Sequence, residues 1–87
     1  MRTNTYSLFD IKAEYFSYPF KAQNDETAKR MVKNNLHDQQ NNQTEYVQNP
    51  EDFILFKIGG FDDATGKVES EVKELISLKE LAKSQES

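Results

Sequence analysis

The chain contains no cysteine, a single histidine and no long apolar run. Without cysteine it has neither a disulfide framework nor a thiolate metal site, which fits a reducing compartment. The lone His37 excludes a Cys–His or Ser–His–Asp arrangement and a nitrogen- or sulfur-rich metal set. We therefore expect no cofactor and no metal site, and we expect that the protein is not an enzyme.

No apolar stretch approaches the roughly 18 residues that a membrane-spanning helix needs. Residues 1–4 lead into alternating polar and apolar residues and not into the apolar core of a signal peptide. We therefore expect that the protein does not associate with a membrane and that it stays in the compartment where it is made. A chain of 87 residues is expected to form one domain, residues 1–87. Because so small a domain buries little surface, pairing into a homodimer would be a natural supplement.

The formal net charge of −4 is unevenly distributed along the chain. Residues 1–36 carry six basic and four acidic groups, a balance of +2, whereas residues 37–87 carry five basic and eleven acidic groups, a balance of −6. The first half therefore suits a polyanionic partner and the second half does not. The alternative is that the acidic groups serve only solubility.

Residues 24–36 form the only long segment with helical periodicity. Ala28, Met31, Val32 and Leu36 fall at spacings that place them on one face, which predicts a helix with an apolar side against the rest of the protein. Asn24 is the expected N-cap, because its side-chain oxygen can accept a hydrogen bond from the first turn.

The segments on either side of this helix are expected to be strands. Residues 5–10 and 15–20 alternate aromatic and polar residues around a connection at 11–14, which predicts a hairpin with Phe16, Tyr18 and Phe20 on one face. Pro19 places its strand at a sheet edge or where the chain leaves the sheet.

Residues 53–58 are apolar on both faces for most of their length, which is typical of a central strand. Residues 62–67 predict a hairpin loop in which Gly66 takes a positive φ. Ser77 and Glu80 fit a capping box, which predicts a short C-terminal helix over Leu78, Leu81 and Ala82.

The remaining segments are polar. Residues 38–49 have little apolar content and are expected to form a flexible loop, and the tail at 83–87 is expected to fray. The order strand, strand, helix, strand, strand predicts an α+β fold: a small antiparallel sheet of about four strands with one helix packed on a face. The pattern does not determine the order of the strands in the sheet.

Binding of single-stranded nucleic acid is the one chemical function with positive support. Aromatic rings stack on bases, and lysine or arginine side chains follow the phosphates. The alternative is that the strand aromatics pack under the helix. The candidate nucleic-acid-binding residues are Lys12, Tyr15, Tyr18 and Lys21 on the hairpin and Lys29, Arg30 and Lys33 on the helix.

A further pattern is formed by the residue types and spacings at 6–10, 12–13, 19–20, 24–25, 28, 30, 50–53, 58–59, 61–62 and 65–67. In this pattern the sequence resembles the small nonstructural protein of gokushoviruses, microviruses with circular single-stranded DNA genomes that infect bacteria. The resemblance covers about residues 5–70 and leaves out residues 38–48 and the tail. It implies a protein of the infected cell's cytoplasm that is absent from the mature virion.

Two hypotheses follow from the residues and the resemblance. In the first, the protein is a non-enzymatic factor that binds single-stranded DNA during genome replication or the switch to packaging. In the second, it is a protein-interaction module that engages a phage replication or procapsid protein, or a host factor, through a sheet edge or the acidic surface.

Overall fold

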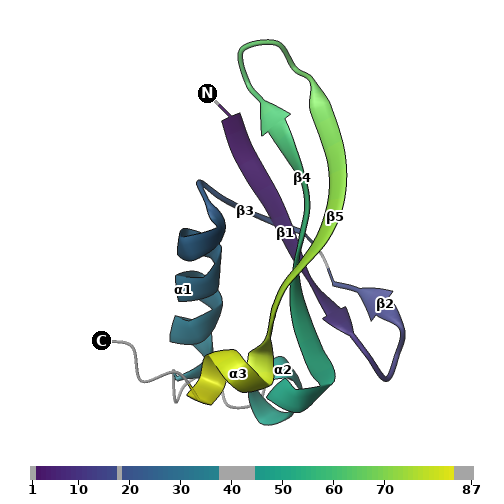
Figure 1. The fold of residues 1–87 in the computed structure, drawn as a ribbon, viewed down its shortest axis with the longest axis vertical. Helices are drawn as coiled ribbons and strands as arrows, with labels where there is room; N and C mark the ends of the chain where they lie inside the picture. Colours follow the sequence, from purple (N-terminus) through teal and green to yellow (C-terminus); the bar gives the residue numbers. More distant parts are fainter. Residues whose placement is uncertain (1, 18, 38–44, 84–87) are drawn as a thin grey trace.

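The computed structural model describes residues 2–17, 19–37 and 45–83. It is an α+β fold with an antiparallel sheet, as the sequence predicts (Figure 1). In chain order the elements are β1 (Arg2–Asp10), β2 (Tyr15–Phe16), β3 (Phe20–Ala22), α1 (Asp25–Leu36), α2 (Glu45–Gln48), the 3-10 helix η2 (Pro50–Asp52), β4 (Phe53–Asp62), β5 (Val68–Ser77) and α3 (Leu78–Lys83).

Strand β1 lies inside the sheet and pairs along both of its edges. One edge pairs with β4, which in turn pairs with β5, and the other edge pairs with β2 and then with β3. The sheet therefore has five strands, because the second predicted strand is interrupted between β2 and β3. The prediction that β4 is a central strand is confirmed.

The interruption also changes which aromatic residues share a face. Phe16 lies opposite Phe9 in β1, whereas Phe20 lies opposite Tyr6. Positions 6 and 9 of a strand point to opposite faces, and residues directly opposite in an antiparallel pair share a face. The prediction that Phe16 and Phe20 share a face is therefore wrong. Tyr18, the third residue of that prediction, lies outside the described residues.

The helix α1 begins where the sequence predicts. Asn24 Oδ1 accepts a hydrogen bond of 2.8 Å from the backbone N–H of Thr27, which confirms the N-cap. Ala28 and Val32 are buried against the sheet. Met31, predicted to lie with them, is 42% exposed and borders a shallow, mostly apolar hollow between α1 and β1.

The C-terminal helix α3 is also confirmed. The backbone N–H of Glu80 donates to Ser77 Oγ at 3.3 Å, and Leu78 and Leu81 are buried. The predicted loop at 38–49 is only partly described; within it, Glu45–Gln48 form the single turn α2. No helix among the described residues is long and apolar enough to span a membrane.

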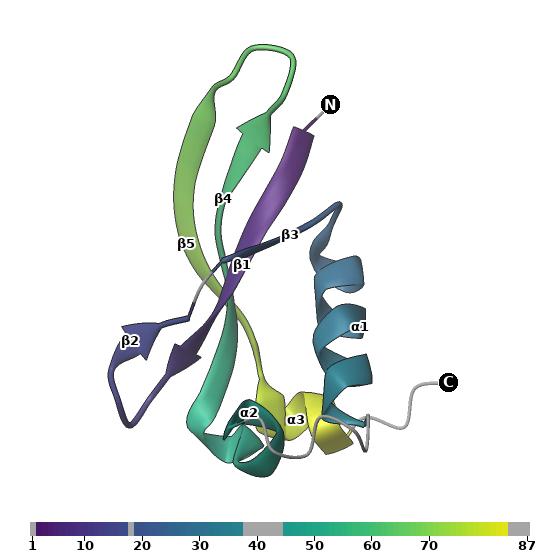
Figure 2. The ribbon, with the colours of Figure 1, turned by 180° about the vertical axis from the view of Figure 1, so that it is seen from behind.

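The core lies on one face of the sheet only. Tyr6 and Leu8 of β1 and Leu55 of β4 pack there against Ala28 and Val32 of α1 and against the leucines of α3. Figures 1 and 2 show α1 on one side of β1 and β2 projecting to the other. We call the side that carries α1 the helix face, and the opposite side the open face.

A buried tyrosine joins the helix face to the start of α1. The side chain of Tyr6 is fully buried, and its hydroxyl donates to Asp25 Oδ1 at 2.7 Å while accepting from Asn4 Nδ2 at 3.1 Å. Burial, followed by the hydrogen bond to the Asp25 carboxylate, raises the pKa of Tyr6 from 10.0 to about 12. The neutral phenol is therefore the form that the folded protein holds.

We expect Tyr6→Phe to lower the free energy of unfolding at pH 7 by about 1–2 kcal/mol, because the Asp25 carboxylate loses its donor. Tyr6 ionises more readily in the unfolded chain, so its contribution is fully present below pH 10 and is lost between pH 10 and about 12. The stability difference between the wild type and Tyr6→Phe, measured by urea unfolding, should shrink over this interval by up to about 1.4 kcal/mol per pH unit. A difference that is constant with pH would contradict this assignment.

The loop between β4 and β5 forms as the sequence predicts. Gly66 has a φ of +77°, its N–H donates to the carbonyl oxygen of Asp62 at 2.7 Å, and the N–H of Asp62 donates to the carbonyl oxygen of Lys67. A hydrogen bond from the backbone N–H of Ala64 lowers the pKa of the Asp62 carboxyl. This hairpin projects beyond the helices (Figure 1).

Candidate nucleic-acid interface

The open face begins at the odd-numbered residues of β1. Thr5 lies opposite Gly59, Ser7 opposite Phe56 and Phe9 opposite Ile54. These residues point away from the core, because Tyr6, Leu8 and Leu55 occupy the alternate positions on the helix face. Within the described part of the chain, all of the helices lie on the helix face, so no helix covers the apolar side chains of the open face, although Ser7 on that face is fully buried.

Three phenylalanines meet on this face and form an aromatic cluster, which we define as Phe9, Phe16 and Phe56. Their ring centroids are 4.9 Å apart for Phe9 and Phe16, 5.3 Å for Phe16 and Phe56, and 6.0 Å for Phe9 and Phe56. Phe16 is 43% exposed, and the other two rings are half-buried. The cluster is therefore a fixed aromatic surface in contact with solvent.

The open face carries further apolar side chains near the tip of the β4–β5 hairpin. Phe61 lies opposite Thr3 in β1 and opposite Val68 in β5, which places all three side chains on this face. Phe61 and Val68 are exposed, as is Val72 further along β5. Phe61 and Val68 lie on the same face as the aromatic cluster, with Thr5, Gly59 and Ser70 between them and the cluster.

Lys21 adds a cation to the open face. It lies in β3 opposite Thr5 and is exposed. Thr5 and Phe9 are four residues apart in β1, so Lys21 and the ring of Phe16 are separated by about 13 Å along the strand direction. Both flank the same edge of β1. On the opposite side of the cluster, Glu74 of β5 lies opposite Phe56, so an acidic residue lies beside the cluster and a basic residue lies further along the same face.

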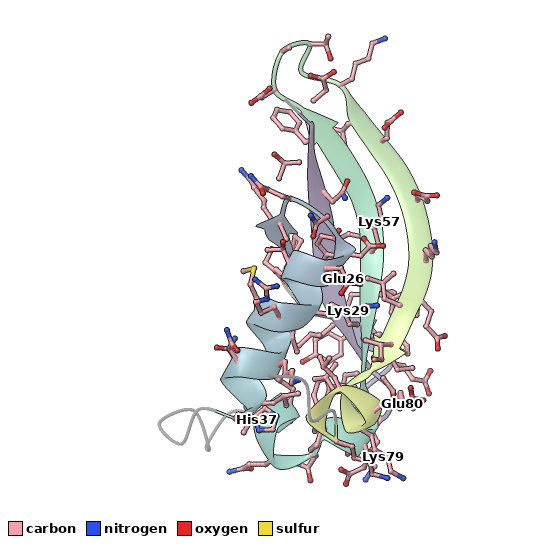
Figure 3. All side chains as sticks on the ribbon, turned by 60° about the vertical axis from the view of Figure 1, so that its left-hand side comes forward. Glu26, Lys29, His37, Lys57, Lys79 and Glu80 are labelled. Carbon is pink, nitrogen blue, oxygen red and sulfur yellow. The ribbon has the colours of Figure 1, made fainter. Side chains whose placement is uncertain are left out.

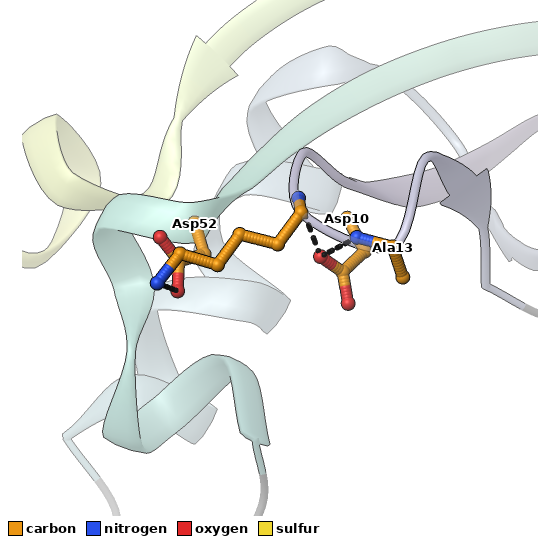
Figure 4. A network of polar contacts seen from close by, with 4 residues as sticks. Asp10, Ala13 and Asp52 are labelled. Carbon is orange, nitrogen blue, oxygen red and sulfur yellow. Dashed lines mark hydrogen bonds and ion pairs between the residues drawn. The ribbon is translucent and has the colours of Figure 1, made fainter.

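Two other candidates of the hairpin lie near the turn between β1 and β2. Asp10 Oδ1 accepts hydrogen bonds from the backbone N–H groups of Lys12 and Ala13, which fixes the turn, and Lys12 Nζ lies 3.6 Å from Asp52 Oδ2 (Figure 4). Tyr15 is 58% exposed but lies opposite Asp10, an even-numbered position of β1. Its side chain therefore starts on the side away from the aromatic cluster.

The candidates on α1 lie on a different surface. Lys29 Nζ is 3.7 Å from Glu26 Oε2 of the same helix (Figure 3), Arg30 is exposed and Lys33 is half-buried. Since α1 packs on the helix face, these cations are separated from the aromatic cluster by the sheet. The structure thus brings Lys21 to the open face, leaves Lys12 and Tyr15 at the turn, and places Lys29, Arg30 and Lys33 on the helix surface. Tyr18 lies outside the described residues.

Sequence reasoning selected no member of the aromatic cluster. Each of the three phenylalanines belongs to a segment that the sequence predicts to be a strand, but the meeting of Phe56 with Phe9 and Phe16 depends on the register between β1 and β4, which pairs residues nearly fifty positions apart. The available signal was the apolar pattern on both faces of residues 53–58. This pattern indicates that both faces of the strand are apolar, but it does not indicate that helices cover only one of the two faces.

The described residues include no group of three or more histidine, cysteine, aspartate or glutamate side chains that could hold a metal ion. The residues that line the hollow beside Met31 include Leu8, Val32 and Tyr46, and none of its lining residues carries a carboxylate, an imidazole, an ammonium or a guanidinium group. The open face is thus the part of the described surface that best suits a macromolecular ligand.

The fold and this surface define an α+β protein in which helices cover one face of an antiparallel sheet. The family model described as Phage ORF5 protein matches residues 3–81, so the chain belongs to this family of phage proteins. No curated protein and no solved structure shows a significant match.

Proposed function

We propose that this phage protein is a non-enzymatic factor that binds single-stranded DNA during genome replication or the switch to packaging. Under this proposal it comes from a gokushovirus, acts in the cytoplasm of the infected bacterium and is absent from the mature virion. The observation that carries the proposal is the uncovered aromatic cluster with Lys21 on the same face. Aromatic side chains that stack on bases beside a cation that contacts phosphate are the usual means of holding a single strand.

The charged residues around the aromatic cluster indicate the path of the DNA strand. Phosphates would be attracted to Lys21 on the β3 side and repelled by Glu74 on the β5 side. We therefore place the DNA backbone along the edge of β1 that carries β2 and β3, with bases directed toward Phe16. The acidic residues of the β4–β5 hairpin, Asp62 and Asp63 among them, lie at its projecting tip, away from this path.

Fluorescence anisotropy with a labelled oligothymidine at low salt tests the proposal. We expect Phe16→Ala to weaken binding about tenfold, the effect of losing one base stack. Tyr15→Ala is the matched control, because Tyr15 is a neighbouring exposed aromatic residue of β2 on the other side. It should weaken binding less than about threefold, well below the effect of one base stack.

The contribution of phosphate contacts is tested by salt. Affinity should fall with rising salt, and Lys21→Gln should reduce the slope of log K against log salt by about 0.7, the value for one phosphate contact on a single strand. Lys67→Gln, which removes an exposed lysine at the hairpin tip, should leave the slope unchanged. Absence of binding at low salt, or equal effects of the two lysine variants, would overturn the proposal.

A further inference from the structure

The outer edge of β5 carries the second unexplained feature of the sheet. Strand β5 is ten residues long and pairs with β4 along one edge only among the described strands. Residues 68–74 are all exposed, and Val72 is 63% exposed. A long edge strand presents unpaired N–H and C=O groups that can pair with another chain.

Both faces of this edge are defined by the pairing with β4. Ser70 lies opposite Gly59 and Glu74 opposite Phe56, which places positions 70 and 74 on the open face. Lys73 lies opposite Lys57, which itself lies opposite Tyr6 on the helix face. Alternation then places Val72 on the open face, and Glu71 joins Lys73 on the helix face, where its Oε1 is 3.2 Å from Lys57 Nζ.

Among two-fold axes placed at residues 69–74, charge favours one register for pairing this edge with a second copy of the chain. Two identical strands that pair antiparallel are related by a two-fold axis perpendicular to the joined sheet. Because residues that lie opposite each other must share a face, one residue lies opposite its own copy in the partner, and the axis runs midway between these two copies. We name each register by this residue. An axis at Glu71 or Lys73 sets like charges against each other, and an axis at Ser70 sets Glu69 against the partner's Glu71. An axis at Val72 instead sets Glu71 against the partner's Lys73, twice by symmetry.

We propose that this protein forms a two-fold symmetric dimer in which the β5 strands pair antiparallel over residues 70–74 around Val72. In this register Val72 meets the partner's Val72 on the open face, and Ser70 meets the partner's Glu74. On the helix face Glu71 lies between Lys57 of its own chain and the partner's Lys73. Residues 70–74 thus contribute complementary side chains on both faces, which a chance edge contact would not provide.

The dimer would join the two sheets into one and make the open faces of both copies continuous. Val68, Val72 and Phe61 would then lie near the centre of this joined face, and one aromatic cluster would lie toward each end. The proposal stands on the β5 edge alone and does not depend on DNA binding, so a failure of either can be recognised separately.

Because the chain contains no cysteine, a single introduced cysteine tests the register directly. Opposite residues in an antiparallel pair have Cβ atoms about 5 Å apart, within reach of a disulfide after small adjustment. We expect Val72→Cys to form a cross-linked dimer under mild oxidation. Ser70→Cys lies four residues from its own symmetry mate, about 13 Å away, and should stay uncross-linked, as should Val68→Cys. Equal cross-linking of the three variants, or none by Val72→Cys, would overturn the proposal.

A charge swap provides an independent test on the protein without cysteine. In sedimentation velocity over a range of concentrations, Glu71→Lys and Lys73→Glu should each raise the dissociation constant about tenfold or more, because two attractive pairs become repulsive. The double variant, with both substitutions, should restore dimerisation to within about threefold, since the pairs are attractive again. Thermal melts of the same proteins measure the stability that is lost with the contact between Lys57 and Glu71 within one chain. This loss can then be distinguished from the change in dimerisation. A protein that stays monomeric, or a dimer insensitive to both single substitutions, would contradict the proposed interface.

Discussion

Replacing Gly59 with alanine is expected to lower the free energy of unfolding by about 3 kcal/mol or more. A Cβ atom at this position would collide with the backbone carbonyl oxygen of Glu69 in the neighbouring strand. The φ of +157° is also one that residues with a side chain rarely adopt. Backbone on both sides of the contact is held by the ladder between β4 and β5, so neither strand can move away without breaking it. Urea unfolding of the variant measures the loss.

Gly66→Ala is the matched control for this prediction. Gly66 also has a positive φ, of +77°, but a Cβ there would meet no atom within 4 Å. We expect the free energy of unfolding to fall by only about 1 kcal/mol, which is the cost of holding an alanine at a positive φ. If both variants lost the same stability, the close approach of Glu69 to Gly59 would not be the cause, and the pairing of β4 with β5 at this point would be in doubt.

Those parts of the fold that depend on local chemistry could be predicted from the sequence. The N-cap at Asn24, the positive φ of Gly66 and the contact of Ser77 with the first turn of α3 each involve residues within four positions of one another. Side-chain and backbone preferences at this range are the same in any fold. The apolar periodicity of α1 and the two-sided apolar pattern of β4 were equally informative.

What the sequence could not provide was the pairing between distant segments. The break between β2 and β3 is stabilised by Ser17, whose carbonyl oxygen accepts from Ser7 Oγ at 2.7 Å and whose Oγ accepts from the N–H of Leu8 at 3.1 Å. Ser7 is itself fully buried. These hydrogen bonds offer the backbone an alternative to a continuous ladder. Nothing in the local pattern of residues 15–20 indicates these hydrogen bonds, which is why the pattern wrongly predicts that Phe16 and Phe20 share a face.

The same limit applies to the candidate site. The sequence places the lysines and tyrosines of the hairpin and the cations of α1 in one candidate site, because all are basic or aromatic and close in sequence. The sheet separates Lys21 from Arg30 and Lys33, and the register of β1 with β4 brings in Phe9 and Phe56 instead. A surface assembled from three strands could be found only once their order and register were known.

We expect Leu55→Ala to lower the free energy of unfolding by about 3–4 kcal/mol. Leu55 is fully buried on the helix face, where it lies opposite Leu8 in β1 and Ile76 in β5. Truncation removes apolar contact with both neighbouring strands and leaves a cavity beneath the helices that they cannot fill without moving from the sheet. A small domain has only about 5–15 kcal/mol of stability, so the loss should lower the midpoint of urea unfolding strongly.

Ile54→Ala is the comparison that separates the two faces of the sheet. Ile54 is the adjacent residue of β4, and its replacement by alanine removes the same number of carbon atoms as Leu55→Ala. It lies on the open face opposite Phe9, where it is half-buried. We expect it to lower stability by about 1 kcal/mol, because solvent can occupy the space that the side chain leaves. If Ile54→Ala were as destabilising as Leu55→Ala, the open face would be a second core covered in solution. A small effect would instead mean that the apolar side chains of this face contribute little to the stability of the fold.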